Sequence, residues 1–440
     1  MSAKVLAAQP PVNLSRQLST YLNQSQDSAA AHTKLIAKCQ QLYKEANFDD
    51  FFDTFTSIMQ HVMITMQKNA HIDRIIDFIA KFSTSLSSKA NNMDNTLVNG
   101  AAAAADNKEN QHNQTANNKS MHDASSLSML DQSGELGNPF LNSLIDYLIE
   151  TNRSNSDAVR YRCCQMLSKL MASINDQFVD EDLFDRMCDA MLERLKDINS
   201  RVQVQAIAAI YRLQDPNDRD CRVIKALLFL MTYDPNWQVR YQALSHVAFS
   251  RATMPDIIDR VRDPHPTVRR KALLILSEKV LIKFISIEKR LFILNYALKD
   301  DDKLVVDTCC KKLLPSWLAF KENDLCKLLK ALDVVDSTET IELMLNKMYA
   351  DESLDRLFAD FSHVLLNEKH VIPTDKLDAE SAFYWSWMCS KCKAIAKTED
   401  NNNQTAAQVD SDDFLDRLLP SLTEFCEYVT DILRKFEVER

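Results

Sequence analysis

One pattern of polar and apolar positions occurs twice in the middle of the chain. An aspartate followed by proline precedes a branched apolar residue five places after the aspartate and a small residue nine places after it. The two copies run from Asp234 to Ala243 and from Asp263 to Ala272. An Asp-Pro pair is typical of a helix start, because the carboxylate can cap free backbone N–H groups and proline is tolerated at the first helical position. The apolar residues then lie on one face of the expected helix.

The same template fits six times along the chain. The copies begin at Ser154, Asp197, Asp234, Asp263, Asp300 and Asp336, at intervals of 43, 37, 29, 37 and 36 residues. Such an irregular period is typical of helix-pair repeats of the HEAT or armadillo kind. Each helix pair has an apolar face that it cannot bury alone, so the pairs stack on their neighbours. The pattern therefore predicts an all-α protein, a HEAT-repeat α-solenoid in which helix pairs form a curved superhelix.

A polar tract over 84–138 interrupts this pattern. It contains all three glycines of the chain, many Asn, Gln and Ser residues, and no aromatic residue. A segment of this composition cannot bury enough apolar surface to offset the entropy lost on ordering. We therefore expect a disordered insertion that tethers the first helices to the main array.

The remaining sequence divides around this insertion. Residues 1–83 predict an N-terminal helical cap or degenerate repeats, with a loose lead-in over 1–29. Residues 139–350 hold the core HEAT-repeat array, with helices expected at 140–151 and 157–173. Residues 351–440 continue the array as a C-terminal helical part. An acidic polar break near 400–413 precedes a final amphipathic helix or helix pair over 414–436.

Composition argues against several functional classes. Phosphate-binding loops, dinucleotide folds and nucleophile elbows need glycines, and the array outside the polar tract has none. We therefore expect no enzyme activity, no cofactor and no small-molecule substrate. A lone Cys389-x-x-Cys392 pair lacks the further ligands of a zinc site and predicts ordinary packing. The prolines at Pro10 and Pro11 argue against a signal peptide, so the eleven cysteines are expected to be reduced thiols. No apolar run is long enough for a membrane span.

The net charge of −10 is unevenly distributed. Residues 351–440 hold 10 basic and 19 acidic side chains, whereas residues 260–290 hold 9 basic and 3 acidic ones. The local charges are therefore −9 and +6. Because fields act at short range in salt, an acidic chain of this kind can still bind a polyanion.

Basic residues occur at recurring template positions. The residue after the branched apolar position is arginine in three copies, Arg160, Arg240 and Arg269. These arginines are expected to bond the leading aspartate of their own or a neighbouring repeat, which is a common structural use of arginine. Arg270 and Lys271 fall further round the helix. They could either contact a ligand or form a solvated face.

Several short phrases of the sequence resemble one known family. They are Ala158-Val-Arg-Tyr-Arg162, Arg194-Leu-Lys-Asp197, Arg212-Leu-Gln-Asp-Pro216, Ser277-Glu-Lys-Val280, Ala382-Phe-Tyr-Trp385 and the helix from His71 to Phe78. Together they are similar to the CAP-G family of HEAT-repeat condensin I subunits, over most of 40–82 and 139–395. Members of that family are about twice this length, so the chain resembles their amino-terminal arm.

The resemblance implies a non-catalytic subunit of an ATP-driven, chromosome-organising complex. Such a subunit binds the kleisin subunit and, through it, the SMC ATPase subunits. It also holds double-stranded DNA in a basic groove during mitotic chromosome condensation, in the nucleus and cytoplasm and on mitotic chromosomes. No membrane or small molecule is implied. The DNA-binding residues carried over are Arg162, Lys196, Arg201, Arg270, Lys271 and Lys283.

If these side chains line one groove, they supply a phosphate track that does not depend on base sequence. No motif for reading bases is present. The alternative is a protein-only HEAT scaffold, such as a transport receptor or phosphatase-type adaptor, because the fold alone does not decide function. The direction in which the basic side chains point distinguishes the two.

Overall fold

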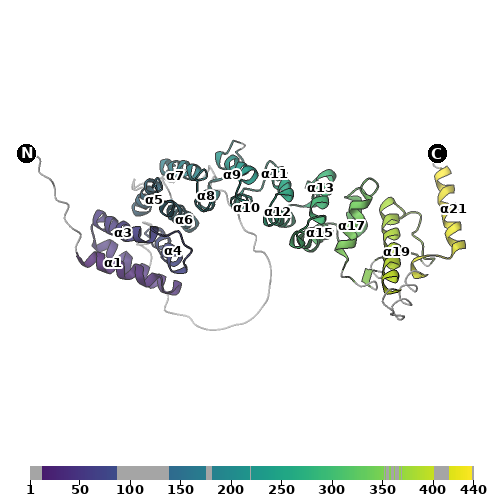
Figure 1. The fold of residues 1–440 in the computed structure, drawn as a ribbon, viewed down its shortest axis with the longest axis horizontal. Helices are drawn as coiled ribbons and strands as arrows, with labels where there is room; N and C mark the ends of the chain where they lie inside the picture. Colours follow the sequence, from purple (N-terminus) through teal and green to yellow (C-terminus); the bar gives the residue numbers. More distant parts are fainter. Residues whose placement is uncertain are drawn as a thin grey trace, which may run out of the picture. The chain divides into compact units, whose positions relative to one another are not determined.

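The computed structural model describes residues 12–86, 138–174, 181–218, 220–350, 352, 356–357, 361, 366–367, 369–400 and 416–438. Within these ranges every regular element is helical, which confirms the all-α class (Figure 1). The chain divides into two units, Met1–Met254 and Pro255–Arg440, and each is described by itself.

Unit 1 consists of helix pairs arranged in two layers. Its helices are α1 (Val12–Ser25), α2 (His32–Glu45), α3 (Phe48–Met63), α4 (Ala70–Thr84), α5 (Pro139–Thr151), α6 (Asp157–Ser173), α7 (Glu181–Arg194), α8 (Ser200–Ile210), α9 (Arg222–Tyr233) and α10 (Trp237–His246), with short 3₁₀ turns at Ala29–Ala31 and Tyr211–Leu213. The helices α4, α6, α8 and α10 pack side by side in one layer, and α5 and α7 lie together in the other. The helix α5 also packs on α6, and α7 packs on α8, so each pair joins the two layers. The helices expected at 140–151 and 157–173 are α5 and α6.

The apolar positions of the template form the core between the layers. The position nine places after the start is fully buried in all six copies. It is a small residue in five of them, Cys163, Ala206, Ala243, Ala272 and Cys309, and Leu345 in the sixth. The branched position is fully buried in five copies, as Val202, Val239, Val268, Val305 and Ile341. Only Val159, in the first copy, is half-buried. Small residues at this position let neighbouring helices approach closely, which explains why five of the six copies have one.

The aspartate that opens each copy lies before the helix cap rather than at it. In four copies its Oδ1 accepts the backbone N–H two residues on, at 2.8–2.9 Å; these are Asp197, Asp234, Asp263 and Asp300. The residue two places on is the N-cap, and its own side chain accepts a further N–H; these caps are Asn199, Asn236, His265 and Asp302. The prediction that the aspartate caps the helix directly was wrong. The aspartate closes the preceding turn, and the helix begins three residues after it.

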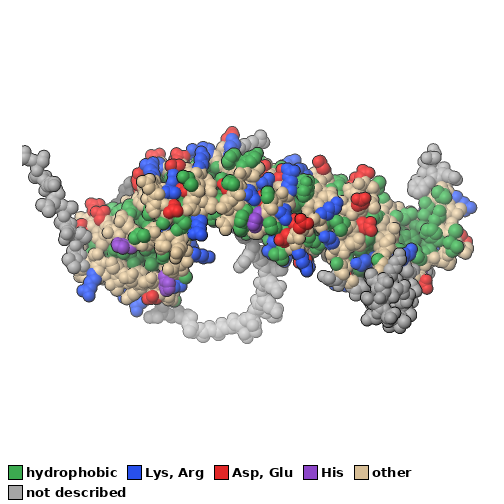
Figure 2. Space-filling model, viewed as in Figure 1, with side chains coloured by type: hydrophobic (Ala, Val, Ile, Leu, Met, Phe, Trp, Pro, Cys, Tyr) green, Lys and Arg blue, Asp and Glu red, His purple; other side chains and the backbone are tan. Residues whose placement is uncertain are grey.

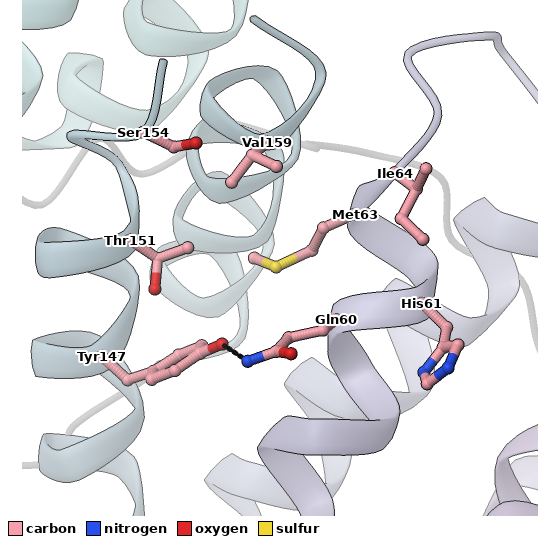
Figure 3. Close-up of a pocket in the computed structure, with 8 residues that line it drawn as sticks. All are labelled: Gln60, His61, Met63, Ile64, Tyr147, Thr151, Ser154 and Val159. Carbon is pink, nitrogen blue, oxygen red and sulfur yellow. Dashed lines mark hydrogen bonds between the residues drawn. The ribbon is translucent and has the colours of Figure 1, made fainter. Parts of the chain in front are cut away.

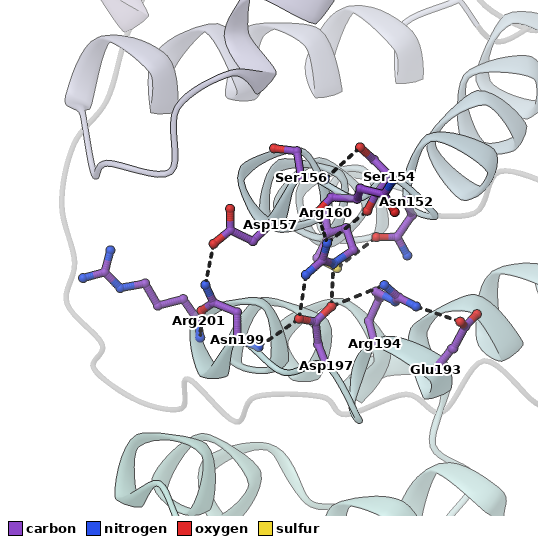
Figure 4. A network of polar contacts seen from close by, with 12 residues as sticks. Asn152, Ser154, Ser156, Asp157, Arg160, Glu193, Arg194, Asp197, Asn199 and Arg201 are labelled. Atoms are coloured by element: carbon purple, nitrogen blue, oxygen red, sulfur yellow. Dashed lines mark hydrogen bonds and ion pairs between the residues drawn. The ribbon is translucent and has the colours of Figure 1, made fainter.

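The same aspartate joins its repeat to the one before. Arg160 donates from Nε to Asp197 Oδ2 at 2.7 Å and from Nη2 to Asp197 Oδ1 at 3.0 Å (Figure 4). Its Nη1 donates to the carbonyls of Ser154 and Asn155 in the turn of its own repeat, both at 3.0 Å. The Asp197 side chain is only 2% exposed, so this paired charge is shielded from water. We call this arrangement the repeat clamp.

The clamp recurs in unit 2, between Arg269 and Asp300. Arg269 donates to Asp300 from Nε at 2.6 Å and from Nη2 at 2.7 Å, and its Nη1 reaches the carbonyl of Asp263 at 2.9 Å. Where the position is Gln203, its Nε2 donates more weakly to Asp234 Oδ2 at 3.3 Å. The expectation of structural arginines is therefore confirmed for Arg160 and Arg269.

The chain entering the array is more ordered than expected. A loose lead-in was expected over 1–29, but α1 occupies Val12–Ser25. Its Leu14, Leu18 and Leu22 are all buried, at a spacing of four residues that lines one side of a helix. The lead-in prediction was wrong because the polar residues between these leucines masked a narrow apolar stripe.

The tract predicted to be a disordered insertion, 84–138, lies outside the described residues except at its two ends. The two ends of this tract lie close together, because Asn138 Nδ2 donates to the carbonyl of Ser83, the residue just before the tract, at 2.6 Å. Just beyond, the ring of Phe140 lies 5.3 Å from that of Phe55, in an edge-to-face contact. The first helices therefore pack directly on α5 and α6.

Unit 2 continues the helix pairs. Its helices are α11 (Met254–Asp259), α12 (Pro266–Lys279), α13 (Ile287–Leu298), α14 (Lys303–Thr308), α15 (Leu314–Phe320), α16 (Leu325–Lys330), α17 (Thr338–Met348), α19 (Ala379–Asp400) and α21 (Leu422–Val438), with 3₁₀ turns at Arg260–Arg262 and Ile282–Phe284. The helix α12 packs on α14 and α15, and α13 packs on α17. α21 agrees with the expected final helix, while most of the break near 400–413 falls outside the described residues.

A proline lies inside a continuous helix in unit 2. Pro315 lies in the first turn of α15, which α14 joins through a π-helical turn, Cys309–Leu313. In that turn Leu314 N–H bonds to the carbonyl of Cys309, five residues back. A proline lacks an N–H and clashes with the preceding turn, so the wider π turn accommodates it.

Replacing Arg269 with methionine tests the clamp in unit 2. The variant leaves the carboxylate of Asp300, only 4% exposed, without its cation. We expect the free energy of unfolding to fall by about 3 kcal/mol, because a buried charge loses its partner. Urea denaturation of the full chain measures this. The exposed pair of Arg356 and Glu352 is the control, since Glu352→Gln should change stability by less than about 0.5 kcal/mol.

Acid should release the clamp in unit 1. Burial acts to raise the pKa of Asp197. The hydrogen bonds from Arg160 and the Asn199 N–H, with the charges of Arg160 and Arg194, outweigh burial and hold that pKa below its usual 3.8. A depressed pKa contributes stability that is complete above the unfolded value and is lost as pH falls through the folded one. Thermal melts of the wild type should therefore drop between pH 4 and pH 2 more steeply than those of Asp197→Asn. Equal slopes would contradict this.

Candidate nucleic-acid interface

In unit 1, two candidate cations lie at the surface beside the first clamp. Lys196 is exposed in the turn between α7 and α8, and Arg201 is exposed in the first turn of α8. Figure 4 shows Arg201 extending away from the hydrogen-bond network around Asp197. Neither side chain forms an ion pair with any residue that the structure describes. Both are therefore available to a phosphate.

Arg162, a third candidate in unit 1, has a different role. Its side chain is 0% exposed, and it donates from Nε to the carbonyl of Thr65 and from Nη2 to that of Gln67, both at 2.7 Å. Burial lowers its pKa, an effect that the charges of Tyr161 and Asp73 partly offset. A fully buried guanidinium with its donors engaged cannot reach a phosphate. The geometry assigns Arg162 a structural role and removes it from the candidate set.

In unit 2, Arg270 and Lys271 lie side by side on α12. Arg270 is exposed and donates from Nε to Thr308 Oγ1 of α14 at 3.2 Å. Lys271 is half-exposed and makes no ion pair within the described ranges. The opposite face of α12 is buried, through Val268, Ala272, Leu273, Ile275 and Leu276. The helix therefore directs both cations away from the core.

Lys283 does not join this pair. It lies in the turn that follows α12, and its Nζ is 5.1 Å from the ring centre of Phe284 and 5.8 Å from that of Phe320. Roughly 13 Å of helix separates Arg270 from the end of α12. Lys283 is exposed and cationic, but it belongs to a separate, partly aromatic surface.

Some of the basic side chains in residues 260–290 are bonded within the protein and are not available to a partner. Arg269 forms the clamp with Asp300. Arg290 donates from Nη1 to the carbonyl of Ala331 at 2.6 Å, and burial lowers its pKa. Figure 2 shows Lys and Arg side chains interspersed with Asp and Glu on the visible face. The local charge of +6 therefore overstates what the surface can offer to a polyanion.

Sequence analysis missed one exposed cation in unit 1. Lys68 lies in the loop between α3 and α4, outside the repeat template, so no spacing marks it. The loop nevertheless reaches the start of α8, since Met66 Sδ is 3.9 Å from Asn199 Nδ2.

A hollow of about 510 Å³ lies near this loop, between α3 and the α5–α6 pair (Figure 3). Gln60 Nε2 donates to the hydroxyl of Tyr147 at 3.0 Å across it. The lining is Gln60, His61, Met63, Ile64, Tyr147, Thr151, Ser154 and Val159. These residues include no lysine or arginine, so the hollow does not extend a phosphate site. It accounts for the incomplete burial of Val159.

The described parts of the chain show neither a metal site nor a membrane-spanning helix. They contain no cluster of three His, Cys, Asp or Glu side chains that could hold a metal ion. None of their helices is both long and apolar enough to span a bilayer. Cys389 and Cys392 lie on α19 as free thiols, and burial raises the pKa of Cys392 to about 11.

The fold first defines a class of protein, the α-helical solenoids built from HEAT repeats. The chain superimposes on a chain of the S. pombe condensin Cnd3–Cnd2 subcomplex with a TM-score of 0.65. The match covers 94% of this chain and 45% of the other, at 23% identity. This likeness confirms the predicted HEAT-repeat solenoid. No family model matches the chain.

Sequence comparison then gives the particular relatives. Condensin complex subunit 3 of Xenopus laevis is 30% identical over 416 residues, which are 94% of this chain and 35% of that protein. The human protein of the same name is 30% identical over 409 residues, which are 92% of this chain and 35% of that protein. Over nearly all its length the chain is thus a relative of condensin complex subunit 3, as the resemblance predicted. It spans about a third of the length of these curated relatives, whereas the resemblance implied about half.

The burial of Cys392 and the exposure of Cys426 predict the order of alkylation. Only the thiolate reacts, so a buried thiol with a raised pKa reacts slowly at neutral pH. We expect iodoacetamide at pH 7.5 to modify the exposed Cys426 well before Cys392, as mass spectrometry of tryptic peptides can show. Modification of Cys392 first would contradict the packing of α19.

Proposed function

We propose that this chain is a non-catalytic condensin subunit that binds the kleisin subunit and duplex DNA. In this role it anchors the complex for mitotic chromosome condensation and reaches the SMC ATPase subunits through the kleisin. Its location would be the nucleus and cytoplasm, and mitotic chromosomes. The kinship with condensin complex subunit 3 carries the proposal. The exposed cations Lys196, Arg201, Arg270 and Lys283 and the half-exposed Lys271 support its DNA-binding part.

The chemistry of these cations favours a partner recognised by its backbone. Lysine and arginine side chains at a surface neutralise phosphates and release counterions, so binding weakens steeply as salt rises. Base reading would need an element that enters a groove with several side chains aimed at base edges. The cations here are few and lie on different helices. The proposed DNA binding is therefore indifferent to sequence.

The kleisin part of the proposal has its own support. The similar chain was solved within the Cnd3–Cnd2 subcomplex of condensin, so a protein of this fold takes a partner subunit. A gel-shift series with duplex DNA, with and without a kleisin fragment, at two salt concentrations tests both partners together. The proposal expects the fragment to bind and to tighten the DNA complex. A protein-only adaptor would bind no DNA under either condition.

Charge reversal on α12 tests the DNA site directly. We expect Arg270→Glu with Lys271→Glu to weaken duplex binding by more than about tenfold near 0.1 M salt. The slope of log K against log salt should become shallower by about two, one for each lost phosphate contact. Fluorescence anisotropy with two duplexes of unrelated sequence measures both effects.

The matched control reverses two other exposed lysines of unit 2, Lys376→Glu with Lys393→Glu, and alters the net charge by a similar amount. If the control weakens binding as much as the α12 variant, net charge and not the α12 site governs binding. Urea denaturation confirms that neither variant is unfolded.

A further inference from the structure

The loop between α3 and α4 is held by the buried Arg162. Two of its backbone carbonyls, those of Thr65 and Gln67, accept from Nε and Nη2 on one edge of the guanidinium, at 2.7 Å each. The third arm of the guanidinium donates from Nη1 to Gln165 Oε1 at 2.5 Å. A planar fork that binds two carbonyls from different atoms holds this loop in one conformation.

The same loop is tied to the start of α8. Met66 Sδ lies 3.9 Å from Asn199 Nδ2, across 133 residues of sequence. Asn199 is the N-cap of α8, and its Oδ1 accepts the N–H of Arg201 at 3.0 Å. The loop and the exposed Arg201 therefore belong to one edge of unit 1. Lys68 is two residues from Met66 and is exposed.

The carboxylates at this edge are already bonded. Asp157 Oδ2 accepts from Asn199 Nδ2 at 2.8 Å. Asp73 accepts from Gln165 Nε2 at 2.9 Å and lies 3.8 Å from Arg162. Lys68 forms no ion pair with any described residue. Its charge remains available at the surface.

We propose that Lys68 contacts a phosphate of the same DNA backbone as Lys196 and Arg201, and that Arg162 is the residue that positions it. Arg162 takes no part in binding itself, because it is fully buried. It acts by holding the loop in one conformation, so that less conformational entropy is lost when Lys68 binds a phosphate. The inference rests on the proposed DNA binding.

Two single substitutions separate contact from positioning. Lys68→Gln removes the charge at an exposed site and leaves the fold intact. Arg162→Lys keeps the positive charge, but one ammonium on a flexible stem cannot bond both carbonyls of the loop as the fork does. Lys81→Gln, an exposed lysine on α4 roughly 16 Å along the helix axis from the end that follows the Lys68 loop, is the matched control for the lost charge.

The measurement is anisotropy of a fluorescent 30-bp duplex titrated with the full chain between 50 and 200 mM NaCl. Lys68→Gln should weaken affinity about fivefold to tenfold near 0.1 M salt and make the log–log salt slope shallower by about 0.9. Arg162→Lys should give the same change in slope. The double variant should be no weaker than the poorer single variant, because both remove one contact.

Three outcomes overturn parts of this account. Lys68→Gln behaving like Lys81→Gln, while the wild type binds with a steep salt slope, refutes the role of Lys68 alone. Additive losses in the double variant, or an Arg162→Lys variant that loses only thermal stability, refute the positioning role. A wild type without salt-dependent binding refutes the proposed DNA binding as well.

Discussion

A shielded carboxylate bonded by an arginine from the preceding repeat is the interaction on which this architecture depends. One aspartate performs three tasks. It closes the turn before its own helix, it sets the N-cap two residues on, and it receives the arginine of the previous repeat. Helix pairs in a solenoid contact only their neighbours, so the geometry of each interface determines how the next pair is placed. A bidentate, charge-assisted contact is better suited to this than apolar packing, which tolerates small rotations.

The clamp also explains why charge counts mislead in this protein. Arginines at Arg160 and Arg269 are bound to carboxylates, and Arg162 and Arg290 are bound to backbone carbonyls. These four residues build the array and cannot also bind a polyanion. Some exposed cations sit beside the structural ones, as Arg201 sits beside the clamp at Asp197.

The sequence predicted the parts of the fold that local pattern controls. The branched and small apolar positions were found because their burial requires a strict spacing, and the structural arginines were found because they share that spacing. The sequence could not show that the aspartate acts two residues before the cap, since both arrangements give the same pattern. It could not show the burial of Arg162, because the loop that covers it lies 95 to 97 residues away in sequence. Lys68 was missed because it lies in a loop outside the repeat template, and α1 was missed because its apolar stripe consists of only three leucines among polar residues.

A double-mutant cycle on Arg160 and Asp197 tests the central claim most directly. Arg160→Met, Asp197→Asn and the double variant are compared by urea denaturation near neutral pH, where the wild-type pair is charged. If the clamp couples one repeat to the next, the coupling energy between the two residues is about 2–3 kcal/mol. A coupling energy below about 0.5 kcal/mol, as for an exposed ion pair, would show that apolar packing alone places the repeats.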